Sequence, residues 1–154
     1  MFVEGVRRQI TPTQAGVMIT DIRRLRTKCS ARIVGLFANH PVTYVNDVVK
    51  SCDLDLVQLC GQEAMPYWLS VDVNVIKQIK IEKDQDPSVV ELKIQNQVSE
   101  IANNGQYAVL DSHKQGHLGG TGETFNWEIA RQISPKYDLV RNTSPRCPNC
   151  YGAF

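Results

Sequence analysis

The sequence predicts an α/β fold built on a parallel sheet. Short runs that are apolar on both faces alternate with stretches whose apolar residues recur every three or four positions, which is typical of buried strands joined by amphipathic helices. Such alternation implies right-handed crossovers in either a β/α-barrel or a doubly wound open sheet, and periodicity does not choose between them. About five to six strand–helix units fit into 154 residues, whereas a complete barrel has eight and usually needs at least about 200 residues.

The composition describes a globular chain with almost balanced charge. It has 42% hydrophobic and 21% charged residues, with 17 Lys and Arg against 16 Asp and Glu. This balance, without a long run of like charges, argues against nucleic acid as a partner. No apolar stretch approaches the roughly 20 residues that span a bilayer, and no secretory signal is visible, so we expect no membrane contact and a cytoplasmic location. The 5 cysteines are an odd number, which suits reduced thiols.

The first helix is expected to begin after Thr11. Thr11 can cap the helix, Pro12 suits its first turn, and Gln14 can complete a capping box. Apolar residues then recur at spacings of three and four, so we expect one face of this helix to pack. That face consists of Ala15, Met18, Ile19, Ile22 and Leu25.

The next units repeat the pattern. A strand is expected over residues 32–37, because this run is apolar on both faces, and a second over 56–59. A turn at 39–41 precedes the helix between them. The apolar stripe of that helix is Val42, Val45, Val48, Val49 and Cys52.

The pattern continues as far as Pro135, which should stop the last helix. The remaining elements are expected, in order, as a short helix around 65–69, a strand over 74–81, a helix with its stripe at Val90, Ile94, Val98 and Ile101 that ends at Asn104 and Gly105, a strand over 107–111, a Gly-rich loop over 112–123, and a helix over 125–133.

Three segments carry a resemblance to a known family. They are VGLFANHP at 34–41, DLVQLCGQE at 55–63 and VLDSHKQGHLGGTGETFNW at 109–127. In this order and spacing they are similar to the third, fourth and sixth strands, with the loops that follow, of the phosphoribosylanthranilate isomerase family. The family usually has His where this chain has Cys60. The resemblance implies a parallel β/α barrel of the TIM type, of which this chain would be a partial copy.

The resemblance covers roughly residues 2–135 and departs at both ends. The opening resembles the family's second strand and places Arg8 at the arginine that holds the anthranilate carboxylate, although Val6 and Arg7 replace the usual Ser-Pro. The family's first strand, with its base cysteine, is not matched, nor are the seventh-strand Gly-Gly loop and the eighth unit that hold the phosphate. We therefore expect a partial barrel domain at 1–135 and a divergent or disordered tail at 136–154.

The implied activity is that of an intramolecular isomerase in tryptophan biosynthesis. The family carries out an Amadori rearrangement of N-(5-phosphoribosyl)anthranilate, in which an acid protonates the ribose ring oxygen and a base then removes the C2 proton. Asp111 matches the family's catalytic Asp, and its place at the end of a buried strand would let desolvation raise the carboxyl pKa and retain a proton. The alternative for a strand-end Asp is to cap the following loop.

Further site residues follow from the same resemblance. The glycine loop could bring backbone N–H groups to an anionic substrate or act as an ordinary connection. Cys60 could replace the base, although a thiol at such a place more often packs than reacts. The Arg8 guanidinium could form two parallel hydrogen bonds with a carboxylate, or it could lie in solvent. The expected substrate-binding residues are Arg8, Gly119, Gly120, Thr121 and Gly122.

No metal and no cofactor are expected. Cys147 and Cys150 have the spacing of half a zinc site, but no second pair lies near them in the sequence. Asp111, His113 and His117 could be drawn as a ligand cluster, yet a flexible Gly-rich loop rarely holds metal geometry.

The expected partner is a small phosphorylated substrate, and three hypotheses for function stay open. The first is an isomerase with little or no activity, because the base and the phosphate site are unmatched. The second is a non-catalytic partial-barrel module that binds a phosphorylated ligand or self-associates as a homo-oligomer through open barrel edges. The third is a flavodoxin-like open sheet that uses the glycine loop for a phosphate.

Overall fold

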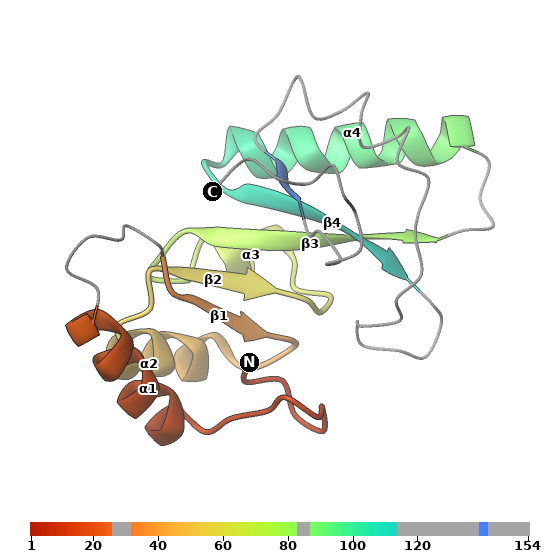
Figure 1. The fold of residues 1–154 in the computed structure, drawn as a ribbon. Coiled ribbons are helices and arrows are strands. Elements are labelled where there is room, and N and C mark those ends of the chain that lie inside the picture. The colour runs from red at the N-terminus through yellow and green to blue at the C-terminus, as the bar shows by residue number, and fades with distance from the viewer. Residues whose placement is uncertain (26–31, 83–86, 114–138, 142–154) are drawn as a thin grey trace. The chain divides into compact units, whose positions relative to one another are not determined.

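The chain folds into two compact units, Met1–Val75 and Ile76–Phe154. The structure, a computed structural model, describes residues 1–25, 32–82, 87–113 and 139–141, and each unit within these ranges joins strands to helices (Figure 1). The described strand pairs are β1 (Val34–Phe37) with β2 (Leu56–Leu59), β3 (Val75–Glu82) with β4 (Tyr107–His113), and β4 with β5 (Leu139–Arg141), and all three are parallel. Parallel pairing of strands joined through helices is what the alternating sequence pattern predicts.

Within residues 1–25 and 32–75, the first unit holds two paired strands and three helices. Its strands run in register from Val34 opposite Leu56 to Phe37 opposite Leu59. The first residues of the chain lie along the first strand, where the Phe2 N–H donates to the Leu36 carbonyl at 2.9 Å. The elements are α1 (Pro12–Leu25), β1 (Val34–Phe37), α2 (Val42–Cys52), β2 (Leu56–Leu59) and α3 (Met65–Trp68).

The predicted capping box at the start of α1 is confirmed. The Gln14 N–H donates to Thr11 Oγ1 at 3.2 Å, and the Thr11 N–H donates to Gln14 Oε1 at 2.9 Å. These two bonds satisfy backbone donors that a helix start leaves without partners. Pro12 is the first residue of the helix, where its missing N–H costs nothing.

The predicted packing face of α1 is only half right. Ala15 and Ile19 are 2% and 8% exposed, but Met18 and Ile22 are 54% and 36% exposed. The apolar residues of this helix cover a stripe wider than the surface that α2 offers, and periodicity does not tell which half of the stripe will be buried. The buried half faces α2, whose Cys52 thiol donates to the Pro12 carbonyl at 3.3 Å.

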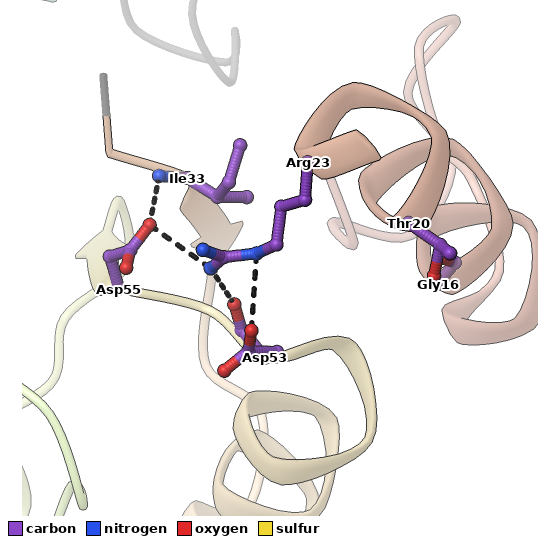
Figure 2. A network of polar contacts seen from close by, with 6 residues as sticks. All are labelled: Gly16, Thr20, Arg23, Ile33, Asp53 and Asp55. Carbon is purple, nitrogen blue, oxygen red and sulfur yellow. Dashed lines mark hydrogen bonds and ion pairs between the residues drawn. The ribbon is translucent and has the colours of Figure 1, made fainter. Parts of the chain in front are cut away.

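Arg23 ties the last turn of α1 to the amino ends of both strands (Figure 2). Its guanidinium donates to the Asp53 carbonyl at 2.6 Å and forms ion pairs with the carboxylates of Asp53 at 3.1 Å and Asp55 at 3.4 Å. Asp55 also accepts the N–H of Ile33 at 2.6 Å. Asp53 ends α2 in the left-handed conformation, with φ 50°. One arginine thus fixes α1 against the segments that lead into β1 and β2.

The second unit is built on β3 and β4. Ile76 lies opposite Tyr107, and the register runs on to Glu82 opposite His113. All four predicted stripe residues of the helix between these strands are buried, and that helix ends where Asn104 and Gly105 predicted it, with Gly105 at φ +70°. The elements are β3 (Val75–Glu82), α4 (Pro87–Asn103), β4 (Tyr107–His113) and β5 (Leu139–Arg141).

Two features of this unit differ from expectation. The fourth strand extends to His113, two residues beyond the predicted end at Asp111. Leu139–Arg141 forms a strand that pairs with β4, within the range that we expected to be a tail. Three residues are too few to show a period in the sequence. The predicted helix over 125–133 lies outside the described residues, and the division of the chain at residue 135 stays a prediction.

Candidate functional site

Asp111 lies on β4, with two strand residues between it and the carboxyl end. Its carboxylate Oδ2 accepts a hydrogen bond of 2.5 Å from Nε2 of Gln78, which lies on β3. Gln78 is paired with Val109, so Asp111 is its diagonal neighbour two positions further along β4. Because side chains alternate between the faces of a strand, Gln78, Val109 and Asp111 share one face of the strand pair.

Lys80 shares this face, because the register places it directly opposite Asp111. Asp111, Gln78 and Lys80 are all half-buried, so the face is partly shielded from water. Here an aspartate, an amide donor and an ammonium group come from two neighbouring strands. Groups of this kind at the carboxyl ends of parallel strands are the usual source of active-site residues in β/α-barrels.

The carboxyl ends of β1 and β2 are joined by a second set of polar contacts. The Asn39 N–H, in the turn after β1, donates to Glu63 Oε1 at 2.7 Å. The Asn39 side-chain oxygen in turn accepts the N–H of Gln62 at 2.8 Å. Asn39 has φ 56°, a conformation that Asn adopts more readily than most residues. We call Asn39, Gln62 and Glu63, with Gly61 between the loops, the loop latch.

The side chains around Gly61 in the loop latch leave almost no space for a side chain at this position. A Cβ atom at this position would lie 2.6 Å from Glu63 Oε1, and also against Asn39 Oδ1. The Glu63 side chain is only 8% exposed, and a buried carboxylate needs such hydrogen bonds to remain charged. The two loops at this end of the first unit are therefore held in one arrangement.

Tyr67 and Trp68 extend the latch into α3. Trp68 Nε1 donates to the Glu63 carbonyl at 2.7 Å, and the Tyr67 hydroxyl donates to the His40 carbonyl at 2.9 Å. Burial, and secondarily the negative charge of Glu63, raise the pKa of Tyr67 above its ordinary value of 10.0. Tyr67 thus keeps its proton and its role as a donor at neutral pH.

Cys60 follows β2 directly, is half-buried, and carries its sulfur as a thiol rather than in a disulfide. Its N–H donates to the Phe37 carbonyl at 2.8 Å, and Gln58 Nε2 lies 3.5 Å from its sulfur. The thiol therefore lies among the groups at the carboxyl ends of β1 and β2. The suggestion that it replaces the family's base stays a prediction.

Arg8 lies in the turn that precedes α1 and is exposed. Burial, and secondarily the charge of Arg8, lower the pKa of the Met1 amino group below its ordinary value of 8.0. The predicted role of Arg8 with a carboxylate stays a prediction. The four predicted loop residues, Gly119, Gly120, Thr121 and Gly122, lie outside the described residues.

Within the ranges that the structure describes, no three or more His, Cys, Asp and Glu residues gather as metal ligands. His117, Cys147 and Cys150 lie outside those ranges. No helix in the same part of the chain is both long and apolar enough to span a membrane.

Sequence reasoning did not single out Gln78, Asn39 or Glu63. Gln78 reads as a polar residue in a strand, and only the register brings it to Asp111. Asn39 was predicted as part of a turn, and Glu63 lies in one of the quoted motifs, but their contact joins residues 24 positions apart. The periodicity of a single sequence carries no information about which distant residues pair in this way.

Comparisons of the sequence with known proteins all point to one family. The family model described as N-(5'-phosphoribosyl)anthranilate (PRA) isomerase matches residues 4–142. The N-(5'-phosphoribosyl)anthranilate isomerase of Pelobacter propionicus is 33% identical over 140 residues, covering 91% of this chain and 60% of that protein. That of Dehalococcoides mccartyi is 32% identical, covering 91% of this chain and 62% of its own length. The chain thus spans less than two thirds of the relatives it matches.

Solved structures share the fold. Phosphoribosyl anthranilate isomerase from Thermotoga maritima aligns with a TM-score of 0.70 at 21% identity, over 91% of this chain and 62% of that one. A phosphoribosyl anthranilate isomerase in complex with reduced 1-(o-carboxyphenylamino)-1-deoxyribulose 5-phosphate aligns with a TM-score of 0.56 at 20% identity, over 73% of this chain and 52% of that one. The predicted fold class, a partial parallel β/α barrel, is confirmed. With a family model matched over residues 4–142, the chain belongs to the N-(5'-phosphoribosyl)anthranilate isomerase family.

Proposed function

We propose that this chain takes part in the Amadori rearrangement of N-(5-phosphoribosyl)anthranilate, the isomerase reaction of tryptophan biosynthesis. The observation that carries the proposal is the place of Asp111, a half-buried aspartate near the carboxyl end of β4 in a chain of this family. A relative of known structure binds a reduced aminoketose phosphate, which supports a small phosphorylated substrate. A cytoplasmic location, where soluble biosynthetic enzymes act, is part of the proposal.

Asp111 would serve as the general acid. Its proton passes to the ribose ring oxygen, the bond from that oxygen to C1 breaks, and the nitrogen lone pair forms a C=N bond. Loss of the C2 proton to a base then gives an enolamine, which becomes the aminoketose. In that last step C1 takes up a proton from the protonated base and the C2 hydroxyl gives its proton to the Asp111 carboxylate, so acid and base return to their starting states and no oxidant or cofactor is needed. We assign the base to no residue of the chain.

Arg8 and the glycine loop would bind the substrate. A guanidinium at residue 8 can form two parallel hydrogen bonds with the anthranilate carboxylate. Backbone N–H groups of Gly119, Gly120, Thr121 and Gly122 would approach an anionic part of the substrate. Both assignments rest on the resemblance of these segments to the family.

The test is a fluorescence assay of phosphoribosylanthranilate consumption. We would compare the chain alone with the chain mixed with a fragment of the Pelobacter propionicus relative that covers the part this chain does not match. The proposal is supported if either sample consumes the substrate and the Asp111→Asn variant of that sample does not. No consumption in both samples contradicts the function, and an unchanged rate in Asp111→Asn contradicts the acid assignment alone.

We also propose that copies of the chain associate through edges of the partial barrel. The apolar neighbours Val17 and Met18 are 61% and 54% exposed on α1, and contiguous exposed apolar surface can mark an interaction site. A dimeric phosphoribosylanthranilate isomerase is known from Thermotoga maritima. Light scattering after size-exclusion chromatography should give the mass of a dimer or larger species, and a monomer at all concentrations would contradict self-association.

A further inference from the structure

We infer that Gln78 is a positioning residue for Asp111, whose amide holds the carboxyl group and stabilises the carboxylate that remains once Asp111 has given its proton to the substrate. The inference rests on the proposed function, because it assigns Asp111 the role of acid. Gln78 lies on β3, the strand next to that of Asp111, and its amide cannot itself act as an acid or a base. Gln78 acts through Asp111 and need not touch the substrate.

The geometry joins the two side chains across the strand pair. Gln78 Nε2 donates to Asp111 Oδ2 at 2.5 Å, and both residues are half-buried on the same face. Because their backbone positions are diagonal neighbours, two residues apart in register, a side chain must be long to span the gap. Gln has this length. The contact also restricts rotation of the carboxyl group about its last torsion, which is otherwise broad.

The chemistry makes the contact stronger as the reaction proceeds. When Asp111 donates its proton, the O–H bond breaks and the electron pair stays on the carboxyl oxygen. A hydrogen bond from an amide N–H to a charged acceptor is roughly twice as strong as one to a neutral acceptor. An interaction that strengthens on the way to the transition state accelerates the step.

Among the side chains that the structure describes on β3 and β4, two other titratable groups share the face, and their effects must be separated from that of Gln78. Lys80 lies opposite Asp111, and Tyr107 lies four residues before it on the same strand. A positive charge on Lys80 also favours the carboxylate. A variant that alters residue 78 alone leaves both groups in place, so any change in the titration of Asp111 is then due to the amide.

The first experiment measures the titration of Asp111 in the full chain by NMR of aspartate labelled at the carboxyl carbon, with Asp111→Asn to identify its signal. In Gln78→Leu, which keeps bulk but removes the donor, the midpoint for Asp111 should move to higher pH. Gln95→Leu is the matched control, because Gln95 Nε2 donates to Glu91 Oε1 at 3.0 Å on α4. That control should leave Asp111 unchanged. An equal midpoint in Gln78→Leu and wild type would overturn the inference.

The second experiment is kinetic, in whichever sample of the consumption assay is active. Gln78→Leu should lower kcat by about tenfold to a hundredfold, the factor expected for losing a hydrogen bond to a charged group, and leave KM nearly unchanged. The pH profile of kcat should shift to higher pH with the Asp111 midpoint. A change confined to KM would overturn the inference. An inactive wild type with a shifted Asp111 midpoint would contradict the proposed function and still support the contact between Gln78 and Asp111.

Discussion

The size of residue 61 is set by its neighbours rather than by its own backbone. Gly61 is buried between the side chains of Asn39 and Glu63 in the loop latch. A chain that accommodates a buried carboxylate with a backbone donor at 2.7 Å has no room for one more carbon atom there. Gly16, by contrast, lies in α1 with only the Ser51 carbonyl within 4 Å of where a Cβ would be, at 3.9 Å.

Gly61→Ala should therefore destabilise the chain. Overpacking a tight site costs about 1–3 kcal/mol of unfolding free energy. Gly16→Ala is the control and should have the opposite sign, because replacing a helical Gly by Ala stabilises by up to about 1 kcal/mol. Urea titration monitored by circular dichroism measures both. Equal effects from the two substitutions would contradict this account of the latch.

Tyr67 should make stability depend on pH at the alkaline end. Its pKa in the folded chain is raised above 10.0, by burial first and by Glu63 second. The folded state therefore holds this proton more tightly than the unfolded state, so its stabilising contribution is complete below about pH 10 and is lost as pH rises through the folded pKa. Tyr67→Phe should show a shallower fall of unfolding free energy above pH 10 than wild type.

Glu63→Gln separates the two causes of the Tyr67 shift. Removing the negative charge should lower the pKa of Tyr67, yet leave it above the ordinary value because burial is the larger cause. Phenolate absorbance, compared between this variant and the same variant carrying Tyr67→Phe, isolates the residue. A pKa at or below the ordinary value would show that the charge, and not burial, dominates.

At the scale of elements, the sequence predicted helices best where caps and a narrow stripe agree. Apolar residues recur along α4 at Val90, Ile94, Val98 and Ile101, and all four are buried. The broader apolar surface of α1 did not reveal which half would pack, because that depends on how much of the helix α2 covers. The short strand β5 escaped prediction because three residues show no period.

The capping box gives α1 a prediction of its own. Thr11→Ala removes the oxygen that accepts the Gln14 N–H and should lower the unfolding free energy by about 1 kcal/mol. Thr13→Ala changes an exposed residue of the same turn and should have an effect of at most about 0.5 kcal/mol. Chemical denaturation compares the pair. A similar loss in both would mean that the box contributes nothing beyond local helix preference.

At the scale of the whole molecule, motifs revealed the family and the fold class, whereas contacts between strands had to come from the structure. Three segments in the family's order pointed to a partial barrel, and the family model confirms the relationship. The sequence could name Asp111 because a strand-end acid lies in one of these segments. Gln78 could not be identified from the sequence, because it meets Asp111 only through the register of β3 and β4, which depends on packing between distant segments.

Because Cys52 is buried, the rate at which its thiol is alkylated reports how often the surrounding structure opens. The thiol is 2% exposed and bonded to the first turn of α1, so an alkylating reagent can reach it only after this region opens. Half-buried Cys60 should react much sooner. Peptide mass spectrometry after iodoacetamide treatment reads each site separately. If opening precedes alkylation, Thr11→Ala should speed labelling at Cys52 about fivefold, the factor for about 1 kcal/mol, with little change at Cys60.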